Sequence, residues 1–357
     1  MSAEHIVLGL MGLFAALGAL DRILGNRLGL GKEFEEGILA MGSLAMAMLG
    51  IICLAPVLAN LLKPLVVPLF SLLGADPAMF AGSLLACDMG AGSLALELTK
   101  NRDAAMLGGV ITGSMLGATL VFTLPVAMGI LREEDRPAMA KGILCGIVTI
   151  PLGILAGGIT AGFPLLMVLR NLIPIVIIGA LIALGLWKAE KAMVRGFAAF
   201  GKAVVALVTA GLGAAILEAL AGITLIPGLA PLSEGFQTVG TIAVILAGAF
   251  PLVAILTKLL RKPLLALGNR LGIGDTGAAG LIASLANSIA ALNLVKDMNY
   301  RGKVVNIAFA VSAAFVFGDH LGFTAGFAPE MLVPMIVGKL TGGITAIALA
   351  LLITKER

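Results

Sequence analysis

Apolar stretches long enough to cross a membrane recur along almost the whole chain, and they constrain the fold more than any other feature. A helix needs roughly 20 such residues to span the ~30 Å hydrocarbon core of a bilayer. Only 12% of the 357 residues are charged, against about 25% in a soluble domain. We therefore expect an all-α polytopic membrane protein, with residues 1–357 forming a single transmembrane domain. The apolar runs are 5–24, 37–61, 77–98, 104–130, 139–161, 171–187, 197–222, 236–260, 277–295, 303–323 and 329–353.

Basic residues predict which loops face the cytoplasm, because inserted chains retain Lys and Arg on that side. Loops 21–36 and 131–141 each carry three basic residues, yet eleven full crossings would place them on opposite sides. The conflict disappears if regions 62–100 and 262–300 make no net crossing. The chain then has about nine full crossings, with its N-terminus outside and its C-terminus inside. Nineteen of the 24 Lys and Arg residues face the cytoplasm in this topology, so the net charge of +4 requires no nucleic-acid partner.

Both non-crossing regions have the composition of an interrupted helix. Each contains a short apolar piece (64–74 and 263–273), then a turn, then a run rich in Gly, Ala and Ser. Non-helical backbone at membrane depth is tolerated only where protein or a wet cavity surrounds it. We predict that each region forms a re-entrant hairpin or a pair of broken helices.

The two halves of the chain resemble each other. Lys63-Pro64 opens the first broken region as Lys262-Pro263 opens the second, and similar Ala-Gly pairs precede Asp88 and Asn287. We predict two inverted repeats, residues 5–161 and 197–353, joined by a linking helix over 171–187. Inverted repeats with discontinuous helices place a substrate site near the middle of the membrane in many secondary transporters.

Asp88 lies beside Gly90 and Gly92 in the first broken region. The glycines permit an unwound backbone with free carbonyl and amide groups. An ammonium group can pair with the carboxylate and hydrogen-bond to those carbonyls, which makes Asp88 a candidate substrate ligand. The alternative is that Asp88 caps a half-helix, as Asp commonly does.

Asn287 occupies the matching position in the second half, and its amide can bind a substrate hydroxyl. It could equally bond between helices or satisfy the broken backbone. Ser83 and Ser288, in the same two regions, are further candidates for substrate contact.

Asp319 and His320 form the other acidic site within a glycine-framed apolar run. Such a pair can bind a cation or relay protons, because His titrates near neutrality; alternatively it lies near the membrane face. Lys339 is a candidate counter-ion for these acids, unless its ammonium snorkels to the interface. Glu35 and Glu36 either draw cations toward a pore or complement a helix dipole.

Several other activities find no support in the sequence. The chain has no phosphate-binding loop, H-E-x-x-H or G-x-S-x-G pattern, so we expect neither an enzyme nor a cofactor. Gly272-Ile273-Gly274-Asp275 matches the G-x-G-D of intramembrane aspartyl proteases, but the second motif that this chemistry requires is absent. The three cysteines lie in apolar runs at spacings that predict no disulfide framework and no metal site. Gly109, Gly113 and Gly117 predict close helix packing, either within the chain or between subunits of a homo-oligomer.

The chain resembles the ethanolamine permease family encoded with bacterial ethanolamine-utilisation operons. Loops near 162–165 and 228–236 are shorter than in some relatives, which puts any role for those loops in doubt. The matching segments are DRIL at 21–24, FEEG at 34–37, APVLA at 55–59, MFAGSLLACDMG at 79–90, IVTIP at 147–151, IPGL at 226–229, RGKV at 301–304, FAVSAAF at 309–315, GDHLGF at 318–323 and MIVGK at 335–339.

The resemblance implies a permease that takes up ethanolamine across a bacterial inner membrane, in contact with membrane lipids. It assigns no role to individual residues. Three rival hypotheses are a permease for another small cationic or polar metabolite, an intramembrane enzyme, and a non-transporting assembly subunit.

The loop charges generate a first testable prediction. Cysteines introduced at positions 133 and 190 of a cysteine-free variant should react with a membrane-impermeant maleimide only from the cytoplasmic side, because the positive-inside rule places both loops there. Labelling of intact cells and of inverted vesicles measures this. Labelling of both positions from the outside alone would contradict the topology.

Overall fold

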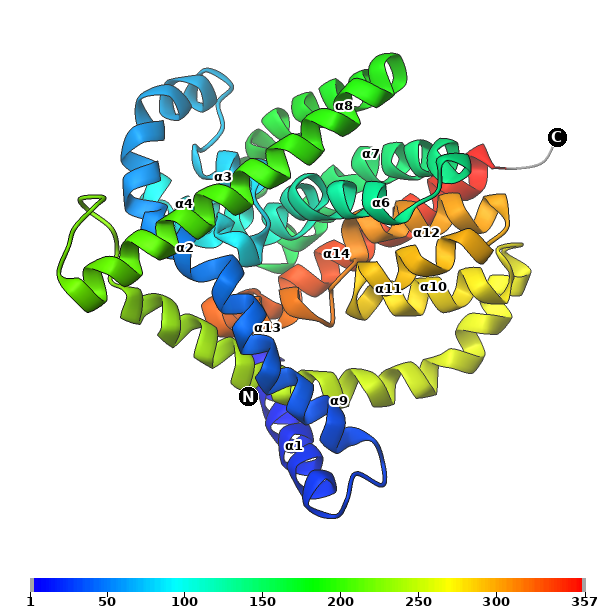
Figure 1. The fold of residues 1–357 in the computed structure, drawn as a ribbon. Helices are drawn as coiled ribbons and strands as arrows, with labels where there is room; N and C mark the ends of the chain where they lie inside the picture. The colour runs from blue at the N-terminus through cyan, green and yellow to red at the C-terminus, as the bar shows by residue number, and fades with distance from the viewer. Residues whose placement is uncertain (1–2, 355–357) are drawn as a thin grey trace.

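The computed structural model describes residues 3–354, apart from the side chains of residues 3, 4, 190, 194, 260, 261, 264, 267 and 269. Every regular element in that part of the chain is a helix (Figure 1). The first half contains α1 (Ala3–Ile23), α2 (Leu30–Leu72), α3 (Ala78–Leu84), η1 (Cys87–Met89), α4 (Ala91–Leu98), α5 (Arg102–Met106), the π-helices η2 (Leu107–Gly117) and η3 (Thr119–Thr123), α6 (Leu124–Ile130), η4 (Glu133–Asp135) and α7 (Arg136–Thr160). The remainder contains α8 (Leu165–Ala221), α9 (Leu232–Arg270), α10 (Gly274–Ala286), α11 (Ser288–Leu294), η5 (Val295–Asp297), α12 (Tyr300–Ala313), α13 (Asp319–Phe327), η6 (Pro329–Met331) and α14 (Leu332–Ile353).

Eight helical segments of the described chain are long and apolar enough to cross a membrane. Their surfaces expose large apolar side chains, among them Leu39, Leu181 and Val244, each more than 60% exposed. Such exposure costs about 25 cal/mol per Å² in water but nothing comparable in lipid. The prediction of an all-α polytopic membrane protein is confirmed. The eight segments are His5–Ile23, Leu30–Leu72, Arg102–Ile130, Glu133–Thr160, Leu165–Ala189, Lys191–Ala221, Leu232–Leu259 and Pro329–Ile353.

Two predicted boundaries and one predicted span differ from the structure. Pro64 and Pro263 do not start new elements, because both lie inside long helices that continue to Leu72 and Arg270. Both helices bend along their length (Figure 1), as expected where proline removes a backbone hydrogen bond. The predicted continuous span 303–323 is divided, since α12 ends at Ala313 and α13 begins six residues later.

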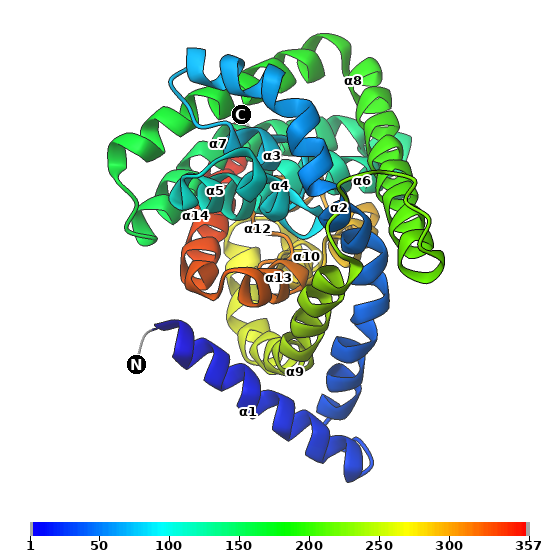
Figure 2. The same ribbon diagram turned by 90° about the vertical axis from the view of Figure 1, so that its left-hand side faces the viewer.

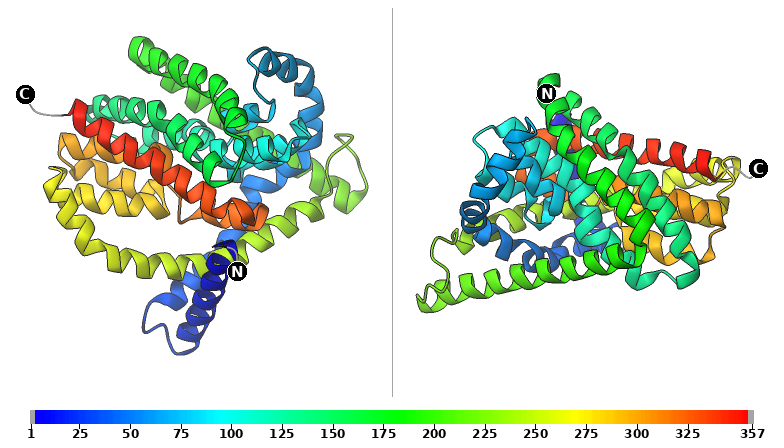
Figure 3. Two further views of the ribbon diagram at one scale, coloured as in Figure 1. Left: turned by 180° about the vertical axis from the view of Figure 1, so that it is seen from behind. Right: turned by 90° about the horizontal axis from the view of Figure 1, so that it is seen from above.

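The long helices enclose a central group of packed helices. α8 and α9 lie on opposite sides of α7, α12 and α14, and the view from behind shows the same arrangement (Figure 3, left). α8 changes direction at Ala189, whose φ of −145° and ψ of 46° are not helical, so it supplies two candidate spans. α1 and the start of α2 form a hairpin that projects from the rest of the molecule beside α9 (Figure 2).

Small residues allow the central helices to approach closely. A Cβ atom at Gly153 of α7 would lie 2.7 Å from the carbonyl oxygen of Gly338 in α14. The glycine ridge of η2 packs within the chain: Gly109 faces Gly92, and a Cβ at Gly117 would overlap the carbonyl oxygen of Leu85. The ridge therefore supports the broken segment α3–η1–α4.

This packing predicts a difference between two glycines of one helical segment. Gly117→Ala should destabilise the fold by about 1–3 kcal/mol, because the new methyl group meets backbone that cannot move easily. Gly129 of α6 has open space around its Cβ position and is exposed, so Gly129→Ala should be neutral or slightly stabilising. Thermal unfolding of the detergent-solubilised variants measures both effects. Equal midpoints for the two variants would show that the close approach of η2 does not matter.

Candidate functional site

The first helix break brings Asp88 to the centre of an interrupted helix. α3 ends because Leu85 and Ala86 are extended, and the short turn η1 follows. Gly90 is the N-cap of α4; its φ of +95° favours glycine, and a Cβ there would overlap the side chain of Ile51. The N-cap residues of η1 and α4, Ala86 and Gly90, make no side-chain capping hydrogen bond.

The second break lies between α12 and α13 and holds Asp319 and His320. Phe315 in this break has a φ of +63°, which is unusual for a residue other than glycine. The amide N–H groups of Phe315 and Phe317 donate to the carbonyl oxygens of Ser284 and Leu285, at 3.0 and 2.9 Å. The break is thus paired with the C-terminal end of α10, another interrupted helix.

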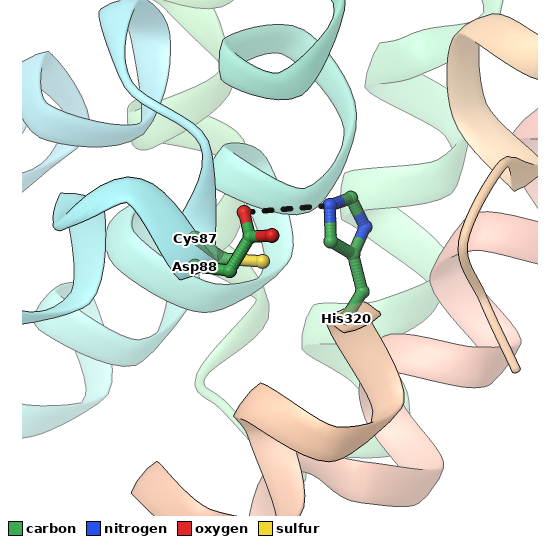
Figure 4. Close-up of side chains that lie close together, drawn as sticks. All are labelled: Cys87, Asp88 and His320. Atoms are coloured by element: carbon green, nitrogen blue, oxygen red, sulfur yellow. Dashed lines mark ion pairs between the residues drawn. The ribbon is translucent and has the colours of Figure 1, made fainter. Parts of the chain in front are cut away.

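The two breaks meet at Asp88 and His320. Nε2 of His320 lies 3.7 Å from Oδ1 of Asp88, and the imidazole ring is buried (Figure 4). That separation is longer than a hydrogen bond. Asp319 lines the same cavity as Asp88, so two carboxylates from opposite halves of the chain share one region.

A cavity of about 690 Å³ opens beside these carboxylates. Asp88 and Asp319 both line it, together with Phe122 and apolar residues of α2, α6 and α8. The ring centroid of Phe122 lies 5.5 Å from that of Phe315, which in turn lies 5.3 Å from the ring of His320. Carboxylates beside aromatic faces form a favourable environment for a small organic cation.

Lys339 of α14 is fully buried and does not snorkel to an interface. Its ammonium group donates a hydrogen bond to the carbonyl oxygen of Ser114 in η2. Its charge also interacts with Asp88. The role of Lys339 as a counter-ion for the acidic residues stays a prediction.

The structure does not gather the remaining predicted ligands around this cavity. Asn287 is exposed at the start of α11, where its Oδ1 accepts a hydrogen bond from the amide of Ile289 at 2.8 Å. Asn287 thus provides a hydrogen-bond acceptor for a backbone amide freed by the interruption of the helix, which was the alternative role considered in the sequence analysis. Ser83 is buried and donates to the carbonyl oxygen of Met79 at 2.7 Å. Ser288 is buried, with no partner for its hydroxyl among the described residues.

Glu35 and Glu36 lie about two helical turns before the cavity-lining residues of α2 and are not part of the cavity lining. Glu35 pairs with Arg22 at 3.2 Å, and Glu36 pairs with Lys32 at 3.6 Å. Both glutamates are exposed and bind neighbouring basic side chains at the start of α2. Surface pairs of this kind contribute about 0–1 kcal/mol to stability.

Sequence reasoning missed two groups at the site. Lys202 lines the cavity, although the loop pattern predicted a cytoplasmic position for it. Cys87 is buried beside Asp88, and its Sγ, a carboxylate oxygen of Asp88 and a ring nitrogen of His320 all lie within 4.8 Å of one another. The position of Cys87 next to Asp88 in the sequence was a signal that it belongs to the site. The proximity of His320 could not be predicted from sequence spacing.

Comparisons with known proteins agree on one family. The model of the family described as "Ethanolamine utilisation protein, EutH" matches residues 3–353. A protein named "Probable ethanolamine permease EutH" from Listeria monocytogenes is 56% identical over 351 residues, covering 98% of this chain and 94% of its own length. The protein of that name from Escherichia coli is 45% identical over 394 aligned positions, covering 100% and 97%. "Uncharacterized protein YxeR" from Bacillus subtilis is 49% identical, covering 98% and 95%. No solved structure matches.

Proposed function

Because the chain belongs to the ethanolamine utilisation protein EutH family, we propose that it is a permease that takes up ethanolamine across the bacterial inner membrane. Relatives that cover nearly its whole length are named probable ethanolamine permeases, and eight of its helical segments are apolar enough to span a bilayer. A permease moves its substrate unchanged, so no catalytic group is required.

The observation that carries the proposal is the pair of carboxylates, Asp88 and Asp319, at one apolar cavity. Burying a charge is costly unless a partner of opposite charge accompanies it. Lys339 supplies one buried cation, whose charge interacts with that of Asp88. An arriving ethanolammonium ion would complete the balance of charge, with Lys202 remaining solvated at the exposed edge of the cavity.

We assign the substrate contacts from this geometry. Asp88 binds the ammonium group, and Asp319 and His320 complete the polar wall opposite it. Phe122 and Phe315 provide the aromatic face, because ammonium ions are attracted to ring quadrupoles. Ser83, Asn287 and Ser288 are proposed contacts for the hydroxyl group in a second conformation, since in this structure they lie outside the cavity lining.

We also propose that the chain consists of two inverted repeats whose broken helices enter from opposite faces. Two ion pairs support this arrangement. Lys303 of α12 pairs with Asp135, just before α7, and Arg102 of α5 pairs with Glu330, just before α14, at 2.6 Å. Each pair therefore joins the start of the helix that follows one half's predicted non-crossing region to the turn that precedes the other half's final helix.

The nine-crossing topology is consistent with these ion pairs, whereas eleven full crossings are not. Nine crossings place Asp135 and Lys303 together inside, and Arg102 and Glu330 together outside. Eleven crossings would separate the partners of each pair by the membrane. The helix starts also correspond, because Asn101 caps α5 and Asn299 caps α12 through the same side-chain oxygen.

Substitution of Asp88 tests the substrate site. Asp88→Asn keeps the size and polarity but removes the charge, and loss of one partner of a buried ion pair costs about 3–5 kcal/mol. Uptake of radiolabelled ethanolamine into proteoliposomes should therefore fall more than about tenfold at neutral pH. Glu97→Gln is the matched control, because Glu97 is exposed on α4 and outside the cavity lining. A correctly inserted Asp88→Asn variant with wild-type uptake would remove Asp88 from the site.

Sidedness of two exposed basic residues tests the opposed broken helices. Lys100→Cys should react with an impermeant maleimide only from outside, and Arg270→Cys only from the cytoplasm, because neither broken region makes a net crossing. The three native cysteines are buried, which limits background labelling. The reverse sidedness at both positions would indicate eleven full crossings.

A further inference from the structure

We propose that Cys87, Asp88 and His320 form a binding site for a thiophilic divalent cation, with Zn²⁺ the ion that fits best, and that the bound metal blocks the permease. The metal site itself depends only on the three side chains. The block rests on the proposed function, since Asp88 is also the proposed ligand of the substrate ammonium.

The spacing of the three ligand atoms suits a metal better than direct contact. Sγ of Cys87, a carboxylate oxygen of Asp88 and a ring nitrogen of His320 lie within 4.8 Å of one another (Figure 4). Ligand atoms bound tetrahedrally at the usual zinc distances are about 3.4–3.6 Å apart. The 3.7 Å between His320 Nε2 and Asp88 Oδ1 is close to that value and too long for a hydrogen bond.

The donor set selects the class of ion. Thiolate, imidazole and carboxylate together favour Zn²⁺ or its substitute Co²⁺ over Mg²⁺ and Ca²⁺, which require oxygen ligands. Three protein ligands leave a fourth position for water, as in zinc sites that remain open. The negative charges of the thiolate and the carboxylate neutralise a bound dication, so no further counter-ion is needed. The positive charge of Lys339 disfavours binding of the dication, and the negative charge of Asp319 favours it.

The site has a route of entry and a limited affinity. Cys87 and His320 are buried, but Asp88 lines the cavity, so a metal ion can reach the ligands from that side. Nδ1 of His320 has no hydrogen-bond partner among the described residues. Metal-binding histidines usually donate from that second nitrogen, and loss of such a partner weakens binding about 10–100-fold. We therefore expect reversible binding by added zinc and not a permanently occupied structural site.

This site could not be predicted from the sequence, because its ligands come from both halves of the chain. Cys87 and Asp88 are neighbours in η1, but His320 belongs to α13. Spacing patterns detect zinc ligands only when they are close together in the sequence. The fold supplies the missing ligand.

Cobalt spectroscopy on the purified protein, prepared without a polyhistidine tag, tests the site independently of transport. A thiolate ligand gives bound Co²⁺ an intense near-ultraviolet charge-transfer band, which Zn²⁺ then removes by displacing the cobalt. We expect this band in the wild-type protein and its loss in Cys87→Ser. His320→Gln should weaken cobalt binding by more than about tenfold.

The chain provides matched controls, since it contains three cysteines and two histidines. Cys53→Ser, Cys145→Ser and His5→Gln should retain the wild-type band and affinity. Absence of the band in folded wild-type protein, or its persistence in Cys87→Ser, would overturn the metal site. The presence or absence of the band in the wild-type protein decides whether the metal site exists, even if a variant fails to fold.

Uptake in proteoliposomes tests the block separately. Zinc should inhibit wild-type uptake of ethanolamine, chelation should restore it, and Cys145→Ser and His5→Gln should respond as the wild type does. Uptake that is unaffected by zinc, in protein that binds cobalt, would overturn the block and leave the site. A complete absence of uptake without zinc would instead contradict the proposed function, while the cobalt measurement would still decide the metal site.

Discussion

The requirement that every backbone polar group be satisfied inside the membrane governs the rest of this structure. Each N–H or C=O left unpaired in hydrocarbon costs several kcal/mol, so a helix can break there only if another part of the protein accepts the freed groups. The break between α12 and α13 meets this condition through Phe315 and Phe317, whose amides donate to carbonyl oxygens at the end of α10. At the start of α11, the side chain of Asn287 accepts a hydrogen bond from the amide of Ile289 and so satisfies a backbone group freed by the break. The interrupted helices are therefore stable only as a group, and the same group carries the charged side chains.

Close packing at glycine residues allows the interrupted helices to lie against their neighbours. Gly318 approaches the carbonyl oxygen of Ala286 so closely that a Cβ there would overlap it, and Gly117 approaches Leu85 in the same way. The first contact joins the α12–α13 break to the end of α10, and the second joins η2 to the end of α3. Carboxylates from distant parts of the chain line one cavity beside these breaks, and the charge of the buried Lys339 interacts with that of Asp88.

The sequence predicted the architecture better than it predicted the contacts. Hydropathy identified the long membrane helices, because lipid imposes a length and a composition on each span, whereas the topology inferred from loop charge stays a prediction. Glycine near acidic residues identified Asp88, Asp319 and His320 as separate candidates. Their convergence could not be predicted, since nothing in local spacing says which broken helices pair. Pro64 and Pro263 were poor guides to boundaries because long membrane helices bend at proline without ending. Asn287 was assigned to the substrate by analogy with Asp88, whereas its backbone role depends on a local turn that the analogy does not capture.

The hydrogen bonds between the α12–α13 break and α10 also have a mechanical consequence. They tie the segment that leads into His320 to the C-terminal end of a straight helix of 13 residues. At 1.5 Å per residue, that helix is a rigid rod about 20 Å long. α10 also packs against α9 and α12, and Asn306 of α12 donates a hydrogen bond to the carbonyl oxygen of Gly277 in α10 at 2.9 Å. The segment that leads into His320 and the loop between α9 and α10 therefore lie at opposite ends of one rigid helix.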